Sequence, residues 1–150
     1  MTSSKTNAKC AEKLTEFLSE SFVLYMKTYA VHWNFQGIKF FSVHKLTESQ
    51  YQDIAGAIDE IAERIRALDF HTPVSLEQIL GPSNLKEFKN TASNDSSLND
   101  LAKSHKKLSQ LGLQMAKDLN ECGDLVSSDM IVNRCKFHDK AHWMLNGLLS

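Results

Sequence analysis

Hydrophobic residues recur every three or four positions along four long segments, and no segment alternates with the period of a β-strand. This spacing predicts helices over residues 9–33, 42–68, 98–121 and from about 127 to the C-terminal end. The second segment has the clearest hydrophobic stripe, which consists of Tyr51, Ile54, Ile58, Ile61, Ile65 and Leu68. A stripe that continues along most of a helix is typical of helices packed in a bundle.

Turn and capping residues separate the predicted helices. Gly37 follows the first helix, and Gly123 separates the third from the fourth. A long connection between the second and third helices contains both prolines, and Ser75 can cap a short helix within it. Ser97 and Asp100 have the spacing of a capping box and predict the start of the third long helix. The order of elements predicts an all-α four-helix bundle with a short helix in the long crossover.

Composition limits the class of protein. The 150 residues suit a single domain, 1–150, in which residues 1–8 are expected to form a flexible N-terminal tail. A net charge of −1 gives no electrostatic reason to expect nucleic-acid binding. No apolar run approaches the ~20 residues that span a bilayer, and the polar start lacks a secretory signal. Cys10, Cys122 and Cys135 are widely spaced and predict free thiols in a cytoplasmic protein.

The second predicted helix carries two pairs of metal-binding residue types. His44 and Glu48 are four residues apart, as are Asp59 and Glu63, so each pair shares a helix face. At roughly 100° per residue, the three carboxylates fall within about 60° of one another, beside the isoleucine stripe. Oxygen ligands with imidazoles suit an ion such as iron. The alternative is that the carboxylates are solvated charges, and spacing alone favours it because such pairs are common on helices.

The length of this helix separates the two pairs. His44 and Asp59 are fifteen residues apart, which is about 22 Å along a helix axis at ~1.5 Å per residue. One ion cannot bridge that distance. If both pairs serve one site, two copies of the helix must pack antiparallel around a two-fold axis near Asp53 or Ile54, which is the commonest kind of contact in homo-oligomers. A metal site built from these pairs therefore requires at least a dimer.

Two stretches resemble the Dps family of miniferritins. HWNFQGIKFFSVHKLTESQYQDIAGAIDEIAERI, residues 32–65, is similar to the family's HWN-x-x-G-x-x-F-x-x-x-H start and D-x-x-A-E-R-I end, and RCKFHDKAHWMLNGLL, residues 134–149, is similar to its closing helix. The resemblance spans essentially the whole chain. It implies a ferritin-like fold and a dodecameric shell of tetrahedral symmetry, with a hollow interior in which ferric oxide collects.

The same resemblance implies a ferroxidase site at each two-fold interface, with iron (Fe2+/Fe3+) as the metal. His32, His44 and Glu48 would come from one subunit. Asp59 and Glu63 would come from its neighbour. Position 48 is often Asp in the family, so Glu48 has a longer reach. The implied oxidant is hydrogen peroxide, which two ferrous ions reduce to water by one electron each without releasing a hydroxyl radical.

Trp33 and an acidic group near the last turn are further candidates. Trp33 adjoins His32 and is a candidate electron donor, although packing at the helix end is an alternative role. The resemblance implies an iron-entry pore at the three-fold axis, lined by acidic residues near the connection between the third and fourth long helices. The candidates are Asp118, Glu121, Asp124 and Asp129. Solvated carboxylates, or a favourable charge at a helix N-terminus, are the alternative.

The remaining histidines give weaker indications. His138 and His142 have a spacing that can hold a metal, but His138 shares a face with apolar residues, which favours a packed core histidine. His71 and His105 have no obvious partner in the sequence. None of these four histidines receives a functional role from the pattern alone.

DNA binding is the other activity that the resemblance brings into question. The strongest DNA binders of the family carry lysine-rich tails that neutralise phosphates, whereas this chain offers only Lys5 and Lys9 before Lys13 and has no C-terminal tail. Weak or no direct DNA binding is expected, with DNA protected through removal of iron and peroxide. Two alternatives stay open: a nucleoid-associated structural protein with incidental metal binding, and a bundle whose carboxylates are only surface charges.

Overall fold

The computed structural model describes residues 3–150, which contain four long helices and one short helix. The helices are α1 (Ser4–Asn34), α2 (Phe40–Ala67), α3 (Leu76–Leu80), α4 (Asp95–Glu121) and α5 (Leu125–Leu149). The described residues contain no strand. The predicted all-α bundle with a short helix in the crossover is therefore confirmed.

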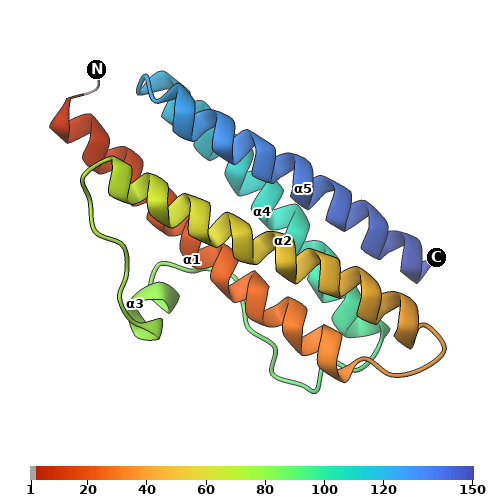
Figure 1. Cartoon of the computed structure of the whole chain (residues 1–150). Coiled ribbons are helices and arrows are strands. Elements are labelled where there is room, and N and C mark those ends of the chain that lie inside the picture. Colours follow the sequence, from red (N-terminus) through yellow and green to blue (C-terminus); the bar gives the residue numbers. More distant parts are fainter. Residues whose placement is uncertain (1–2) are drawn as a thin grey trace.

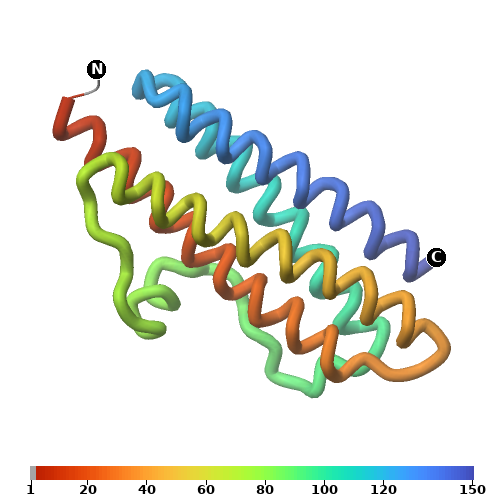
Figure 2. The backbone as a smooth tube through the Cα atoms, in the orientation of Figure 1, coloured from red at the N-terminus to blue at the C-terminus, as the bar shows by residue number. Residues whose placement is uncertain are grey.

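The long helices pack as two antiparallel pairs, α1 with α2 and α4 with α5 (Figure 1). The crossover that contains α3 runs back along the bundle from the end of α2 to the start of α4 (Figure 2). Its path is held by the buried carboxylate of Glu20 on α1, which accepts hydrogen bonds from the backbone N–H groups of Asn84 (2.5 Å) and Leu85 (3.0 Å). The start of α1 consequently lies at the same end of the bundle as the α4–α5 turn (Figure 1).

α1 begins at Ser4, five residues before the predicted start. The side chain of Ser3 caps it by accepting the N–H of Thr6 at 3.2 Å. Residues 4–8, which were expected to belong to a flexible tail, are helical, and the tail prediction is wrong for them. The first two residues of that predicted tail lie outside the described residues.

α4 also begins earlier than the pattern predicted. Its cap is Asn94, whose side chain accepts the N–H groups of Ser96 and Ser97. The predicted cap at Ser97 is wrong, because this residue lies inside the first turn, where its hydroxyl donates to the Asn94 carbonyl at 2.6 Å. α2 begins at Phe40, two residues before its predicted start.

The core fills the space between the four long helices in two adjoining clusters. Ile61 and Ile65 belong to the cluster near the α4–α5 turn, and Ile54 belongs to the other. All three are fully buried, as the stripe on the second helix predicted. None of the helices in residues 3–150 is both long enough and apolar enough to cross a membrane.

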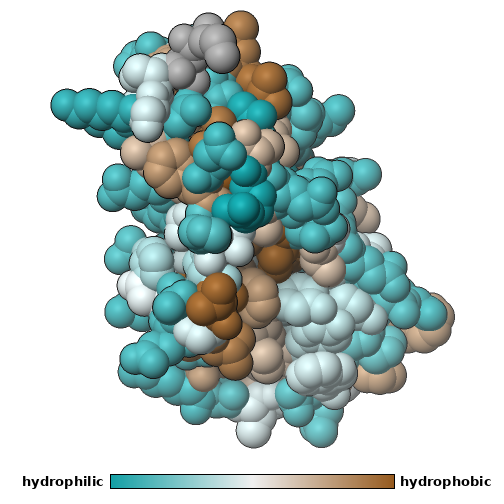
Figure 3. Space-filling view, turned by 60° about the vertical axis from the view of Figure 1, so that its left-hand side comes forward, coloured by the Kyte–Doolittle hydropathy of each residue, from teal (hydrophilic) through white to brown (hydrophobic). Residues whose placement is uncertain are grey.

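Several large apolar side chains remain on the surface of the single chain. The most exposed are Ile38, Val74, Phe41, Trp143, Leu76, Leu125, Val126 and Trp33. Figure 3 shows hydrophobic patches that interrupt an otherwise largely hydrophilic face. Large apolar patches of this kind mark interaction surfaces in soluble proteins.

Candidate metal centre

His32 and His44 face each other across the junction of α1 and α2. Gly37, with φ of 112°, occupies the left-handed region that suits glycine and lets α2 fold back onto α1. His32 lies near the end of α1, and His44 lies in the second turn of α2. Their rings stack with centroids 3.7 Å apart and planes at 14°. The turn thus brings together two imidazoles that are twelve residues apart in the sequence.

Reciprocal hydrogen bonds fix both imidazoles. The Nδ1 of His32 lies 2.8 Å from the carbonyl oxygen of His44, and the Nδ1 of His44 lies 2.8 Å from the carbonyl oxygen of His32. A carbonyl only accepts, so each Nδ1 carries the proton and donates it. In the neutral imidazole, Nε2 then carries the lone pair, which is the tautomer that backbone carbonyls impose on metal-binding histidines.

The protonation state of His32 also suits metal binding. His32 is buried, and burial lowers its pKa below the ordinary histidine value. Glu48 lies close enough for its charge to oppose this shift in part. The Glu48 carboxylate is half exposed and lies 3.6 Å from the Lys45 ammonium. This end of α2 therefore offers two imidazoles, of which His32 favours the neutral form, and the carboxylate of Glu48.

Asp59 and Glu63 form a second group, exposed on the outer surface of α2. The pKa of Glu63 is raised, first by a hydrogen bond with the Asp59 side chain and then by its negative charge. Two carboxylates this close repel each other when both are ionised, and a bound cation relieves that repulsion. The chemistry of the pair therefore fits a divalent or trivalent metal ion.

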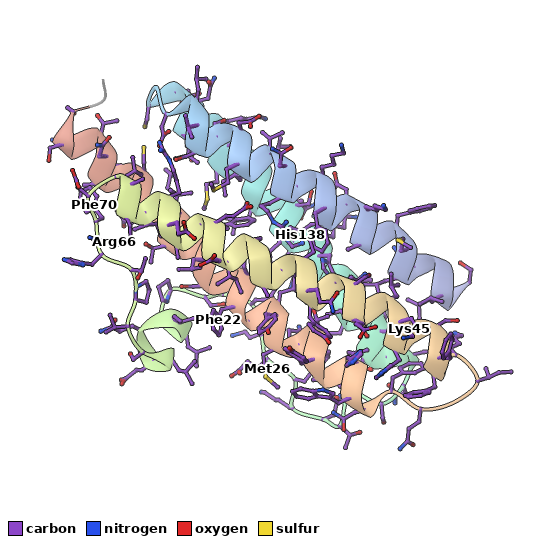
Figure 4. All side chains as sticks on the ribbon, in the orientation of Figure 1. Phe22, Met26, Lys45, Arg66, Phe70 and His138 are labelled. Atoms are coloured by element: carbon purple, nitrogen blue, oxygen red, sulfur yellow. The ribbon has the colours of Figure 1, made fainter. Side chains whose placement is uncertain are left out.

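One chain does not bring the two groups together. Figure 4 shows Lys45, next to His44, and Arg66, three residues beyond Glu63, near opposite ends of α2. Among residues 3–150, no group of three or more His, Cys, Asp or Glu side chains is arranged to hold a metal ion. The structure stacks His32 on His44, with Glu48 one turn further along α2, and places Asp59 and Glu63 as a separate pair on the same helix.

A stack of aromatic rings leads from the histidines to the surface. Trp33 is 59% exposed and stacks on Tyr29 with centroids 4.6 Å apart. Tyr29 stacks on Tyr51 at 4.2 Å, and Tyr51 meets the His32 ring edge-on at 5.1 Å. The pattern assigned Tyr51 to the core stripe of α2 and overlooked its contact with His32. The four-residue spacing of Tyr25, Tyr29 and Trp33 was the available indication that these rings share a face.

The four candidate pore residues have different environments. Asp124 is buried, caps α5 by accepting the Ser127 N–H at 3.0 Å, and receives a hydrogen bond from Arg64 at 2.9 Å. Its Oδ1 atom thus stabilises the fold, and a role of Asp124 in a pore lining stays a prediction. Asp118 is half-buried and paired with Lys13 at 2.9 Å. Glu121 and Asp129 are the two that are exposed.

The remaining histidines lie away from this centre. His138 is fully buried in the bundle (Figure 4), as predicted for a core histidine. Its Nδ1 lies 2.9 Å from the Nδ1 of His105, a partner that the sequence did not reveal. The Nδ1 of His142 donates to the Ala102 carbonyl, and His71 lies beside Arg66 in the crossover.

Comparison with known proteins gives one consistent result. The model of the ferritin-like domain matches residues 11–150. The chain is 29% identical over 143 residues to the "DNA protection during starvation protein" of Helicobacter pylori strain J99, covering 95% of this chain and 99% of that protein. It is similar to the crystal structure of a Dps protein from Vibrio cholerae O1, described as a member of the ferritin-like diiron-carboxylate superfamily, with a TM-score of 0.92, 30% identity, and coverage of 99% and 94%. A Dps protein from Bacillus brevis matches with a TM-score of 0.93, 25% identity and full coverage of both chains.

Proposed function

The chain belongs to the Dps family of ferritin-like proteins, and we propose that it oxidises Fe(II) with hydrogen peroxide and stores the ferric product. The observation that carries this proposal is the reciprocal hydrogen bonding of His32 and His44, which leaves two Nε2 lone pairs available beside Glu48. Buried or half-buried neutral imidazoles with a nearby carboxylate are suited to ferrous iron. Asp59 and Glu63 of a second subunit would complete the site.

Two-fold packing of α2 against its copy would bring these groups together. A copy placed antiparallel sets Asp59 and Glu63 of one subunit beside His44 and Glu48 of the other, because the two pairs are equally spaced about the helix centre. Apolar surface near the histidines supports such a contact, since Phe41 is 70% exposed. We further propose a dodecameric shell, in which exposed side chains on α5 such as Trp143 form a separate contact between subunits.

The chemistry proposed for this site is balanced for two ferrous ions. Each ion gives one electron to hydrogen peroxide, the O–O bond breaks, and two protons complete two water molecules while two ferric ions form. His32 and His44 would bind the entering ferrous ions through their Nε2 atoms, and the metal charge would relieve the repulsion between the Asp59 and Glu63 carboxylates. Paired electron transfer avoids the one-electron cleavage that releases a hydroxyl radical.

Two further roles belong to the same proposal. Trp33 would supply an electron when only one ferrous ion is bound, since the stacked rings of Tyr29 and Tyr51 connect it to His32. Glu121 and Asp129 would attract ferrous ions towards the shell at the turn between α4 and α5, because both carboxylates are exposed there.

A peroxide pulse tests the function. The protein is loaded anaerobically with Fe(II), peroxide is added, and ferric absorbance and residual peroxide are measured. We expect two Fe(II) oxidised per peroxide consumed. Replacing the ligands (His32→Ala with His44→Ala) should slow the reaction by at least about 100-fold. His71→Ala is the matched control, because this histidine lies in the crossover. One Fe(II) per peroxide, or an unaffected ligand variant, would refute the proposal.

Direct DNA binding is the second candidate function, and we expect it to be weak. The net charge is −1, and Lys5 and Lys9 lie in α1 instead of in an extended tail. Few phosphates can therefore be neutralised, so plasmid mobility should be unchanged at physiological salt and neutral pH. A variant with several lysines added before Ser3 serves as the positive control and should retard the plasmid. A salt-resistant shift by the unmodified protein would instead favour the nucleoid-associated alternative.

A further inference from the structure

Two of the three cysteines meet at the end of the bundle where α1 begins. Lys13 pairs with Asp118, and Lys27 donates to Ser104, each at 2.9 Å. Lys27 follows Lys13 by fourteen residues, and its partner Ser104 precedes Asp118 by fourteen residues. The two helices therefore run antiparallel with a fixed register. Three residues before Lys13, this register places Cys10 opposite the last residues of α4, where Cys122 is the C-cap. Cys122 also packs against the core cluster to which Cys10 belongs, so both cysteines lie in the same part of the bundle.

The two thiols differ in their access to solvent. Cys10 is 1% exposed and belongs to the core cluster at this end of the bundle. Cys122 is partly buried, packs against that cluster, and lines a hollow of about 590 Å³ together with Arg64 and Asp124. A small oxidant can therefore reach Cys122 from the hollow, while Cys10 lies behind it. Both cysteines are free thiols in the structure, as the sequence predicted.

We propose that Cys10 and Cys122 form an intrachain disulfide when the protein meets hydrogen peroxide. The Cys122 thiolate attacks one peroxide oxygen, an S–O bond forms, the O–O bond breaks, and the departing hydroxide takes a proton to become water. The Cys10 sulfur then attacks the Cys122 sulfur, an S–S bond forms, and the S–O bond breaks with loss of a second water. Two thiols and one peroxide thus give one disulfide and two waters.

The environment of Cys10 makes it the second sulfur to react, not the first. Burial, followed by the nearby Asp124 charge, raises the pKa of Cys10 to about 11. A thiol of that pKa is a poor first nucleophile towards peroxide at neutral pH. Proximity to Cys122 gives it a high effective concentration once the Cys122 sulfenic acid has formed.

The bond would join the second turn of α1 to the turn between α4 and α5. It closes a loop that contains most of α1 and all of α2, α3 and α4, and such long loops give the largest loss of entropy in the unfolded chain. The oxidised protein should therefore unfold at a higher temperature than the reduced protein. Since the proton and electron balance needs peroxide but no iron, this inference is independent of the proposed ferroxidase site.

Thiol counting on iron-free protein tests the inference. The reduced, assembled protein is treated with hydrogen peroxide, alkylated under denaturing conditions and analysed by peptide mass spectrometry. We expect two of the three thiols to disappear, with a linked Cys10–Cys122 peptide and an alkylated Cys135. The melting temperature should rise on oxidation and return with dithiothreitol.

Variants separate this disulfide from other oxidation. Cys122→Ser should abolish both the linked peptide and the rise in melting temperature. Cys135→Ser is the matched control and should retain both, because Cys135 lies on α5 with its thiol donating to the Ser109 carbonyl. Overoxidised but unlinked Cys122, a link between chains, or three intact thiols in the wild-type protein would each overturn the proposal, whatever the result with iron.

Discussion

Two inactive variants should regain about a quarter of the wild-type rate of iron oxidation when their subunits are mixed. One variant carries His32→Ala with His44→Ala, and the other carries Asp59→Ala with Glu63→Ala. Each alone loses part of every site and should oxidise iron at least about 100-fold more slowly. The mixed shell is prepared by co-expression, and the initial rate of ferric absorbance after a peroxide pulse is measured.

The recovery follows from the separation of the two groups along α2. In a mixed dimer, one site combines both damaged halves and is inactive, while the other combines both intact halves and is complete. Random pairing makes about half of the dimers mixed, and each has one complete site of two. Ligands that come from a single chain are not reunited by mixing.

A third variant with all four substitutions provides the control. Mixed with the histidine variant, it supplies no intact histidine half, so no complete site forms. Recovery in this mixture, or no recovery in the first mixture although both variants assemble, would refute a site shared between subunits.

The sequence predicted the fold because each long helix carries a continuous apolar stripe. Ile54, Ile61 and Ile65 were assigned to the core from their spacing, and all three are fully buried. Such a pattern depends only on the helical period, which is a property of the local chain.

Helix starts were predicted less well because several neighbouring residues can cap. Asn94, Ser96 and Ser97 all have side chains of the capping type. A contact from a distant part of the chain accompanies the cap at Asn94. The Gln36 N–H donates to the Ser93 carbonyl at 3.0 Å and fixes the residue just before Asn94. A pattern read along one segment does not contain that contact.

In the candidate site too, features set by spacing along one helix were predicted, whereas contacts between helices were not. The spacing of His44, Glu48, Asp59 and Glu63 predicted two groups on α2, and the structure places them accordingly. The stacking of His32 on His44 depends on how closely α1 and α2 approach, and the burial of Asp124 depends on Arg64 from α2. Neither follows from spacing, which is why the tautomers and the burial of Asp124 were not predicted.

The buried pair of His105 and His138 should make the protein sensitive to acid. Both side chains are fully buried, and their Nδ1 atoms share one hydrogen bond at 2.9 Å. Their Nε2 atoms have no hydrogen-bond partner. Burial, followed by the charge of Arg134, lowers the pKa of His105 to about 3, and burial and the charge of His105 lower the pKa of His138 well below its usual range. His105 is therefore neutral in the folded bundle at pH 5, and the neutral form of His138 is favoured by the same burial.

The direction of the effect follows from the protons bound in each state. The unfolded histidines titrate near ~6.5, so below that pH the unfolded chain binds more protons than the folded chain. The free energy of unfolding is then unaffected by this pair above ~6.5 and falls as pH decreases towards the folded pKa values. By pH 5 the loss is about 2 kcal/mol for His105, and the lowered pKa of His138 adds a loss in the same direction.

Urea unfolding at pH 7 and pH 5, at one protein concentration, measures this loss as a shift in midpoint. His105→Gln with His138→Gln removes both titrating groups, so the loss of unfolding free energy between the two pH values should shrink by at least about 2 kcal/mol, even if this variant is less stable at pH 7. His71→Gln is the matched control and should keep the wild-type shift, because His71 is exposed in the crossover and packs in no core. An equal pH dependence in the double variant and the wild type would show that acid acts elsewhere in the fold, since the two buried imidazoles are then not the groups that must remain neutral.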